Sequence, residues 1–166
     1  FYRTFGAPGL AIVIGTDVLK TVIAVVAGGL IMGTQGAAST GQVFAGFCVM
    51  LGHIYPVFYG FRGGKGVLCA ETMLLIVSFP TGLVSLLIFV GIVWATRYVS
   101  LGSVAAAVSL PFTTYFVFHN TACTVLGTCI SLLVLWAHRS NIKRLLSGTE
   151  SKFHFHVNAP KPGEDE

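Results

Sequence analysis

Charged residues are scarce in this sequence. Only 10% of the 166 residues are Asp, Glu, Lys or Arg, whereas a soluble domain usually carries about a quarter. With 54% hydrophobic residues and a mean hydropathy of +0.82, the chain has too few charges to solvate a globular surface. This composition excludes an ordinary soluble domain and predicts an integral membrane protein, whose surroundings are membrane lipids and not nucleic acid.

Cysteine is scarce as well. The chain has four cysteines, and each lies inside an apolar run: Cys48, Cys69, Cys123 and Cys129. None of their spacings is typical of a metal site or of a disulfide framework. We therefore interpret them as small apolar residues buried between helices.

Six apolar segments have the character of membrane-spanning helices, each of which needs about 20 apolar residues. They run near 8–32, 42–59, 66–79, 80–97, 100–118 and 121–138. The third segment is short, and Pro80 and Gly82 separate it from the fourth. A single helix over 66–97 is the alternative, which this proline and glycine disfavour.

Basic residues occur in every second connection between these segments. "FRGGKG", "TRYVSLGS" and "HRSNIKRLLSGTESK" carry Lys and Arg, as does the N-terminal stretch with Arg3, whereas the intervening connections carry none. Short basic loops stay on the cytoplasmic side of a membrane. We predict an all-α protein with about six transmembrane helices and its active site on the cytoplasmic face. Residues 1–146 form one transmembrane domain, and 147–166 form a loose, polar cytoplasmic tail.

A few polar residues fall inside the predicted spans. Asp17 and Lys20 share a helix face and can form a pair, and Glu71 lies in the third span. Such groups either line a polar cavity for a charged ligand or neutralise one another, with Glu71 pairing to a neighbouring Arg. We interpret His53 as a packing residue and expect Pro56 to kink its helix.

The segment 60–66 combines glycines with two basic residues, Arg62 and Lys65. Glycine lets successive backbone N–H groups turn toward one point, and such a nest at a helix N-terminus binds anions. The Walker pattern does not fit, because Gly66 stands where that loop needs Ser or Thr. The segment is therefore a candidate phosphate-binding loop, with a flexible turn as the alternative.

Two further basic segments carry groups suited to phosphate oxygens. Arg97, Ser100 and Ser103 open the fifth span, and His138 and Asn141 lie three residues apart after the sixth. The alternatives are a helix cap at Ser100 with Arg97 as a membrane-edge anchor, and basic residues that complement a helix dipole. Together with the glycine segment, they point to an anion site on one membrane face.

The segment "GHIYPVFYGFRGGKGV" at 52–67 resembles the central motif of the bacterial acyl-phosphate:glycerol-3-phosphate acyltransferases. "RYVSLGS" at 97–103, "HRSNIKRLLSGTE" at 138–150 and "DVLK" at 17–20 are similar to further segments of that family. The resemblance implies seven spans in a full-length protein. It also implies that "FYRTFG" follows a first span and a first motif, "GSGNxGxTN", that are absent from this chain.

The resemblance implies transfer of an acyl group from acyl phosphate to the 1-hydroxyl of glycerol 3-phosphate, which gives lysophosphatidic acid and phosphate. Acyl-CoA is not the donor, no metal or cofactor is required, and the protein acts as a monomer in the bacterial inner membrane. The residues implied as catalytic are Lys65, Ser103, His138 and Asn141. Those implied to bind substrate phosphate are Arg3, Gly63, Gly64, Lys65, Gly66, Arg97 and Ser103.

The residues also leave two rival functions open, an anion transporter and a non-catalytic lipid-binding scaffold. A transporter is disfavoured because the polar groups gather on one face and no internal repeat is visible. No Ser-His-Asp or Cys-His arrangement argues for an acyl-enzyme. Either a phosphate oxygen of the substrate or His138 could accept the hydroxyl proton, and we favour the substrate.

Overall fold

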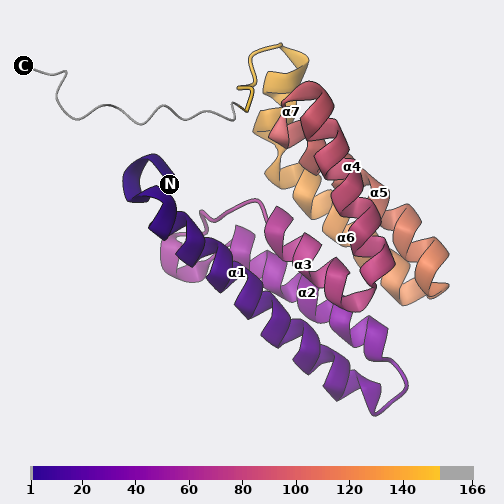
Figure 1. The fold of residues 1–166 in the computed structure, drawn as a ribbon. Coiled ribbons are helices and arrows are strands. Elements are labelled where there is room, and N and C mark those ends of the chain that lie inside the picture. Colours follow the sequence, from indigo (N-terminus) through magenta and orange to yellow (C-terminus); the bar gives the residue numbers. More distant parts are fainter. Residues whose placement is uncertain (1, 154–166) are drawn as a thin grey trace, which may run out of the picture.

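The computed structural model describes the backbone of residues 2–153 and the side chains from Pro8 onward. This part of the chain is all-helical, as predicted (Figure 1). Its elements are α1 (Tyr2–Gly33), α2 (Ala38–Ile54), the 3-10 turn η1 (Val57–Tyr59), α3 (Val67–Val77), α4 (Phe79–Thr96), α5 (Val99–Phe118), α6 (Thr121–Ala137) and α7 (Arg139–Leu146).

Fewer of these helices are long enough to cross a membrane than the sequence predicts. Four candidate spans have sufficient length and hydropathy: Pro8–Gly33, Ala38–Tyr59, Phe79–Thr96 and Val99–Phe118. The α6 helix qualifies only when it is joined to α7 across a 61° bend. With 11 residues, α3 is about 16 Å long, roughly half of the hydrocarbon core. By length and composition, the described residues therefore hold four to five candidate spans, compared with the six that the sequence predicts.

The break between α3 and α4 confirms that 66–97 is not one helix. Ser78 ends α3 in an extended conformation and caps α4, where its hydroxyl oxygen accepts a hydrogen bond from the Thr81 hydroxyl at 2.9 Å. Pro80 occupies the first turn of α4, where its missing N–H costs no helical hydrogen bond. The chain reverses here, and Gly82 of α4 lies directly against Leu75 of α3.

Two predicted local features differ in the structure. Pro56 does not kink α2, because the helix ends at Ile54 and Pro56 precedes η1 instead. Ser100 does not cap α5 either, since that helix begins at Val99 with Tyr98 at the N-cap position. The first difference ends the apolar helix earlier than predicted and lengthens the connection between α2 and α3.

The helix connections fall at two ends of the bundle (Figure 1). The turn after α1 lies at one end with the α3–α4 and α5–α6 junctions. The glycine segment 60–66 and the α4–α5 and α6–α7 junctions lie toward the other end. All three predicted phosphate-binding segments therefore reach the same end of the molecule, as the alternation of basic connections requires.

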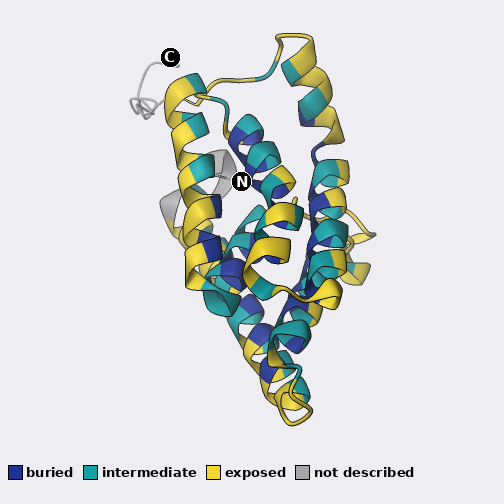
Figure 2. Cartoon of the chain, turned by 90° about the vertical axis from the view of Figure 1, so that its right-hand side faces the viewer, coloured by how far each residue is buried: buried dark blue, intermediate teal, exposed yellow. Residues whose placement is uncertain are grey.

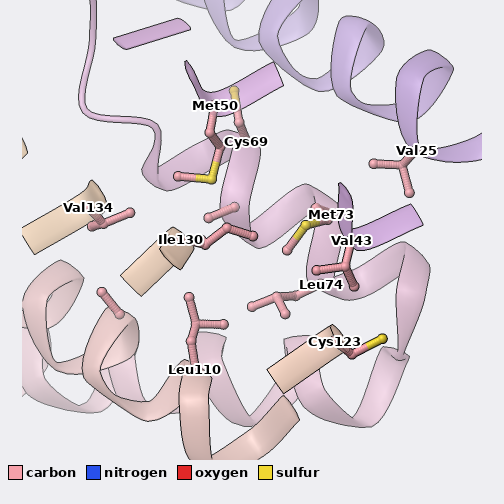
Figure 3. Close-up of a cluster of buried hydrophobic side chains, with 12 residues drawn as sticks. Val25, Val43, Met50, Cys69, Met73, Leu74, Leu110, Cys123, Ile130 and Val134 are labelled. Atoms are coloured by element: carbon pink, nitrogen blue, oxygen red, sulfur yellow. The ribbon is translucent and has the colours of Figure 1, made fainter. Parts of the chain in front are cut away.

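Many large apolar residues are exposed, as expected for contact with lipid. Exposed positions recur along the outer faces of the helices (Figure 2). Inside, a core cluster includes Met50, Met73 and Ile130 (Figure 3). All four cysteines are free, but only Cys69 and Cys123 are buried. Cys48 is exposed, so the expectation that every cysteine is buried was wrong.

Close backbone contact between α1 and α2 depends on glycine. A Cβ atom on Gly41 would overlap the carbonyl oxygen of Gly28. Small residues of this kind let helices approach closely in membranes. We expect Gly41→Val to lower the thermal unfolding temperature in detergent, because overpacking costs about 1–3 kcal/mol. The matched control is Gly91→Val on α4, where an added Cβ meets nothing within 4 Å. Equal stability of the two variants would contradict this account.

Candidate active site

A cavity of about 470 Å³ lies between α1, α3, α4, α5 and the α6–α7 junction. Cavities of this size hold small organic ligands. Its polar lining residues are Lys65, Glu71, Ser100, Ser103 and His138, and the others, such as Leu86 and Phe89, are apolar. Three of the four residues predicted as catalytic therefore meet at one cavity, although they lie up to 73 positions apart (138 − 65).

His138 occupies the bend between α6 and α7, and only 2% of its surface is exposed. Its Nδ1 atom lies 2.9 Å from the carbonyl oxygen of Val134. A carbonyl oxygen can only accept a hydrogen bond, so Nδ1 carries the proton in the neutral ring. Nε2 is then the unprotonated nitrogen, and it can accept a hydrogen bond from a hydroxyl group bound in the cavity.

Ser103 lies in the second turn of α5 and is 4% exposed. Its hydroxyl donates a hydrogen bond to the carbonyl oxygen of Val99 at 3.0 Å. A phosphate oxygen also needs a donor, so Ser103 must rotate its hydroxyl away from Val99 before it can bind one. The buried site makes this exchange possible without exposing the hydroxyl to bulk water.

The glycine segment binds back onto the end of α2. The Gly64 amide donates to the carbonyl oxygen of His53, and the Gly63 amide donates to that of Ile54, both at 3.1 Å. A Cβ atom at either glycine would overlap His53. These two amides are therefore engaged within the protein, and they shape the loop instead of forming an open anion nest.

The start of α3 offers unpaired amides close to Lys65. Gly66 precedes this helix in a left-handed conformation with φ of 77°, which glycine adopts without strain. No side chain caps the helix, so the N–H groups of its first turn have no partner within it. Helix N-termini of this kind bind phosphate. Lys65 and the beginning of α3 therefore form the anion-binding part of the segment.

Glu150 is a residue of this region that the sequence interpretation missed. Its carboxylate oxygens accept hydrogen bonds from Asn141 Nδ2 at 2.7 Å and from Arg144 Nε at 2.6 Å. The Phe153 amide also donates to the carbonyl oxygen of Arg97 at 2.7 Å. Residues 147–153 thus fold back from α7 onto the α4–α5 junction, so this part of the predicted loose tail is held in place. An acidic residue within a basic segment was the available signal.

Hydrogen bonds keep Glu150 ionised. The bond from Asn141, the nearby Ser100 hydroxyl and Arg144 lower the pKa of Glu150 to about 2. Glu150 in turn opposes the decrease in the pKa of Lys65 that partial shielding from water causes. Lys65, Asn141 and Glu150 therefore belong to one charged network at this end of the bundle.

We expect Glu150→Gln to lower the unfolding temperature at neutral pH, because it replaces a charge-assisted hydrogen-bond acceptor. The folded-state pKa lies below the ordinary value of 4.5, so this stabilisation is complete above that value and is lost as the pH falls toward about 2. The difference from the wild type should stay constant between about pH 8 and pH 5 and shrink below it. Thermal unfolding across this range checks the prediction, and an unchanged unfolding temperature at pH 7 would contradict it.

The remaining predicted residues lie around the cavity. Asn141 is 5% exposed and reaches the network through Glu150. Arg97 ends α4 in a left-handed conformation with φ of 63°, and its side chain does not line the cavity. Gly66 is buried next to Met50. Arg3 falls outside the residues whose side chains the structure describes.

The polar residues inside the predicted spans are paired. Lys20 Nζ lies 2.5 Å from Asp17 Oδ1, which confirms their predicted pairing, and 2.9 Å from His53 Nδ1. His53 is therefore more than the packing residue that the sequence suggested. Glu71 accepts a hydrogen bond from Ser85 at 2.8 Å, so its described partner is a serine and not an arginine.

One group of side chains has the composition of a metal site. Ligand atoms of Asp17, His53 and Cys69 lie within 4.8 Å of one another. These residues come from three different helices, so the spacing of cysteines along the sequence gave no sign of the group. The Lys20 ammonium already contacts two of the three ligands and takes the place that a metal cation would need.

The chain matches a known protein family over most of its length. The family model described as glycerol-3-phosphate acyltransferase matches residues 1–148. A glycerol-3-phosphate acyltransferase of Thermoanaerobacter sp. (strain X514) is 41% identical over 150 residues, which cover 90% of this chain and 73% of that protein. One from Geobacter sulfurreducens is 39% identical over 153 residues, covering 92% and 76% respectively.

Solved structures of a relative are also similar. The crystal structure of PlsY (YgiH), an integral membrane glycerol 3-phosphate acyltransferase, in its glycerol 3-phosphate form superposes with a TM-score of 0.80 at 34% identity. The match covers 92% of this chain and 75% of that one. The lysophosphatidic acid form gives a TM-score of 0.79 at 36% identity, covering 92% and 76%.

Proposed function

This chain belongs to the glycerol-3-phosphate acyltransferase family, and we propose that its acyl donor is an acyl phosphate. As a member of this family it is an integral membrane enzyme that acylates glycerol 3-phosphate and produces lysophosphatidic acid. The observation that carries the proposal is the shared cavity of Lys65, Ser103 and His138. It combines groups for phosphate with apolar walls suited to a fatty chain.

The donor follows from the chemistry that the site offers. Acyl phosphate is a mixed anhydride, so its carbonyl carbon is already reactive and phosphate leaves readily. The site has no nucleophile activated by a neighbouring base among its described residues, and an acyl-enzyme is not needed. The main task is to hold two anions together and to direct a hydroxyl group at the carbonyl carbon.

The transfer then takes place in one displacement. The 1-hydroxyl oxygen of glycerol 3-phosphate attacks the carbonyl carbon, an ester bond forms, and the bond between this carbon and the phosphate oxygen breaks. The hydroxyl proton passes to an oxygen of the substrate phosphate. His138 accepts a hydrogen bond from the attacking hydroxyl through Nε2 and orients it, since its Nδ1 proton is held by Val134.

Positive charge offsets the repulsion between the two substrates. Lys65 and the first turn of α3 bind substrate phosphate, while Gly63, Gly64 and Gly66 fix the place of Lys65. Ser103 donates to phosphate after releasing Val99, and Asn141 supports the site through Glu150. Arg97 and Arg3 also bind substrate phosphate, as the family resemblance implies. These fixed groups also stabilise the negative charge that develops on the carbonyl oxygen.

The membrane orientation follows from the basic connections. We propose that the protein lies in the bacterial inner membrane with its basic loops and C-terminal segment on the cytoplasmic side. Residues 1–146 act as one transmembrane domain, and 147–166 as a polar cytoplasmic segment. All groups assigned to the reaction come from one chain, so a monomer suffices for activity, and neither metal nor cofactor takes part.

A donor assay tests this function. The gene product in membranes is given labelled glycerol 3-phosphate with either acyl phosphate or acyl-CoA, and lysophosphatidic acid and phosphate are measured. We expect product from acyl phosphate alone. Product from acyl-CoA alone would overturn the donor assignment. A correctly inserted protein that forms no product with either donor would contradict the proposed reaction and favour transport or lipid binding.

A further inference from the structure

Three polar side chains form a cluster at the interface of α1 and α2. Asp17 and Lys20 of α1 lie 3.3 Å and 2.9 Å, respectively, from Nδ1 of His53 on α2. The Asp17 and His53 side chains are 13% and 18% exposed. Ionisable groups inside a membrane span are costly, and they are commonly retained where they serve function.

The same histidine contacts the glycine segment in two ways. Its carbonyl oxygen accepts the Gly64 amide hydrogen bond at 3.1 Å. Its ring nitrogen Nε2 lies so close to Gly64 that a Cβ atom there would overlap it. Gly64 precedes Lys65 directly, so only one peptide unit separates the histidine contact from the phosphate-binding lysine.

We propose that His53, oriented by Asp17 and Lys20, is a positioning residue that places Gly64 and thereby the Lys65 ammonium for glycerol 3-phosphate binding. This role rests on the proposed function of Lys65. His53 itself does not line the cavity and touches no reacting atom. It acts through the loop alone.

The protonation of the ring follows from its partners. A lysine ammonium can only donate hydrogen bonds, so Nδ1 of His53 accepts from Lys20. Nε2 then carries the ring proton and is directed at Gly64. Asp17 holds Lys20 in place, since its carboxylate lies 2.5 Å from the ammonium. The ion pair therefore fixes both the tautomer and the orientation of the ring, and the ring limits how closely the glycine segment can approach α2.

A small displacement of a substrate-binding group strongly lowers the reaction rate. A shift of about 1 Å can cost roughly 100-fold. If the ring is removed, the Gly63 and Gly64 amides keep their carbonyl acceptors, so the loop stays attached but is less well placed. We therefore expect His53→Ala to raise KM for glycerol 3-phosphate by about tenfold and to leave KM for acyl phosphate within about twofold.

A double-mutant cycle separates this role from a general structural one. Gly64→Ala in the wild type adds a methyl group that overlaps the ring and should lower kcat/KM for glycerol 3-phosphate by about 100-fold. In His53→Ala the methyl group has room, and the same change should cost less than about threefold. Gly52→Ala on α2 is the control, because an added Cβ there meets nothing within 4 Å.

Each variant's KM and kcat/KM are compared with those of the wild type. A failure of the positioning role therefore differs from a failure of the proposed function, in which the wild type itself forms no product. Additive effects of the two substitutions, or equal changes in KM for both substrates, would overturn the positioning role. If His53→Ala does not fold, Asp17→Asn combined with Lys20→Met removes both charges together and should raise KM for glycerol 3-phosphate selectively. If the wild type does not turn over acyl phosphate, calorimetric titration with glycerol 3-phosphate applies the same cycle to binding, with the same two outcomes.

Discussion

Lys65→Ala is expected to lower kcat/KM by at least about 100-fold while the protein still inserts and folds. Lys65 is the full positive charge beside the unpaired amides of α3, and it lines the same cavity as His138. Its loss leaves two anionic substrates without a counter-charge inside the cavity. The measurement is the acyl phosphate assay on purified variant and wild type at equal amounts of inserted protein.

The control for this variant is Lys143→Ala on α7. Lys143 is exposed on the same face of the membrane and does not line the cavity. The Lys143→Ala substitution removes one positive charge from the surface and none from the cavity, so near-normal activity is expected. Near-normal activity of Lys65→Ala would instead show that the glycine segment is an ordinary turn, and equal loss in both variants would show that only the overall charge of this face matters.

His138→Ala is expected to lower kcat by about 100-fold, whereas His138→Gln should retain activity to within about tenfold. The reason lies in the neutral ring, whose Nδ1 donates to Val134 and whose Nε2 can only accept. A glutamine side-chain oxygen can also accept a hydrogen bond from the glycerol hydroxyl, but it cannot take up the proton. The glutamine variant therefore still orients the glycerol hydroxyl group. It can no longer accept the proton, as a histidine could.

The pair of variants decides which group receives the proton. If kcat of His138→Gln is as low as that of His138→Ala, the histidine is the base and the assignment of the proton to the substrate phosphate is wrong. Thermal unfolding of both variants is the control, because His138 is buried and its removal leaves space beside Val134. Variants with matched stability are compared by kcat at saturating concentrations of both substrates.

The sequence predicted the fold class and the family correctly, and both follow from local signals. Apolar length, the Pro80 and Gly82 turn and the alternation of basic connections all lie within short stretches of chain. The spatial meeting of Lys65, Ser103 and His138 was also inferred, since the basic connections must share one membrane face. Their chemical roles remain proposals until the variants are measured.

The errors arose where packing overrides composition. The third apolar segment gives a helix of only 11 residues, because the chain reverses at Ser78. Glu150 was placed in a loose tail because its partners, Asn141 and Arg144, are brought to it by a turn after α7. The contact of His53 with Lys20 joins two helices whose relative rotation no periodicity specifies.

The short α3 helix also sets how far the proposed reaction site lies from the end of the bundle. α3 ends and α4 begins at the reversal at Ser78. Because α4 has 18 residues and α3 has 11, the first residue of α3 lies roughly 10 Å short of the level that the last residue of α4 reaches. In the proposed reaction, phosphate is then released at the bottom of a recess and leaves toward the water, while the fatty product departs sideways between helices into the bilayer. The two products therefore leave by different routes, and neither blocks the exit of the other.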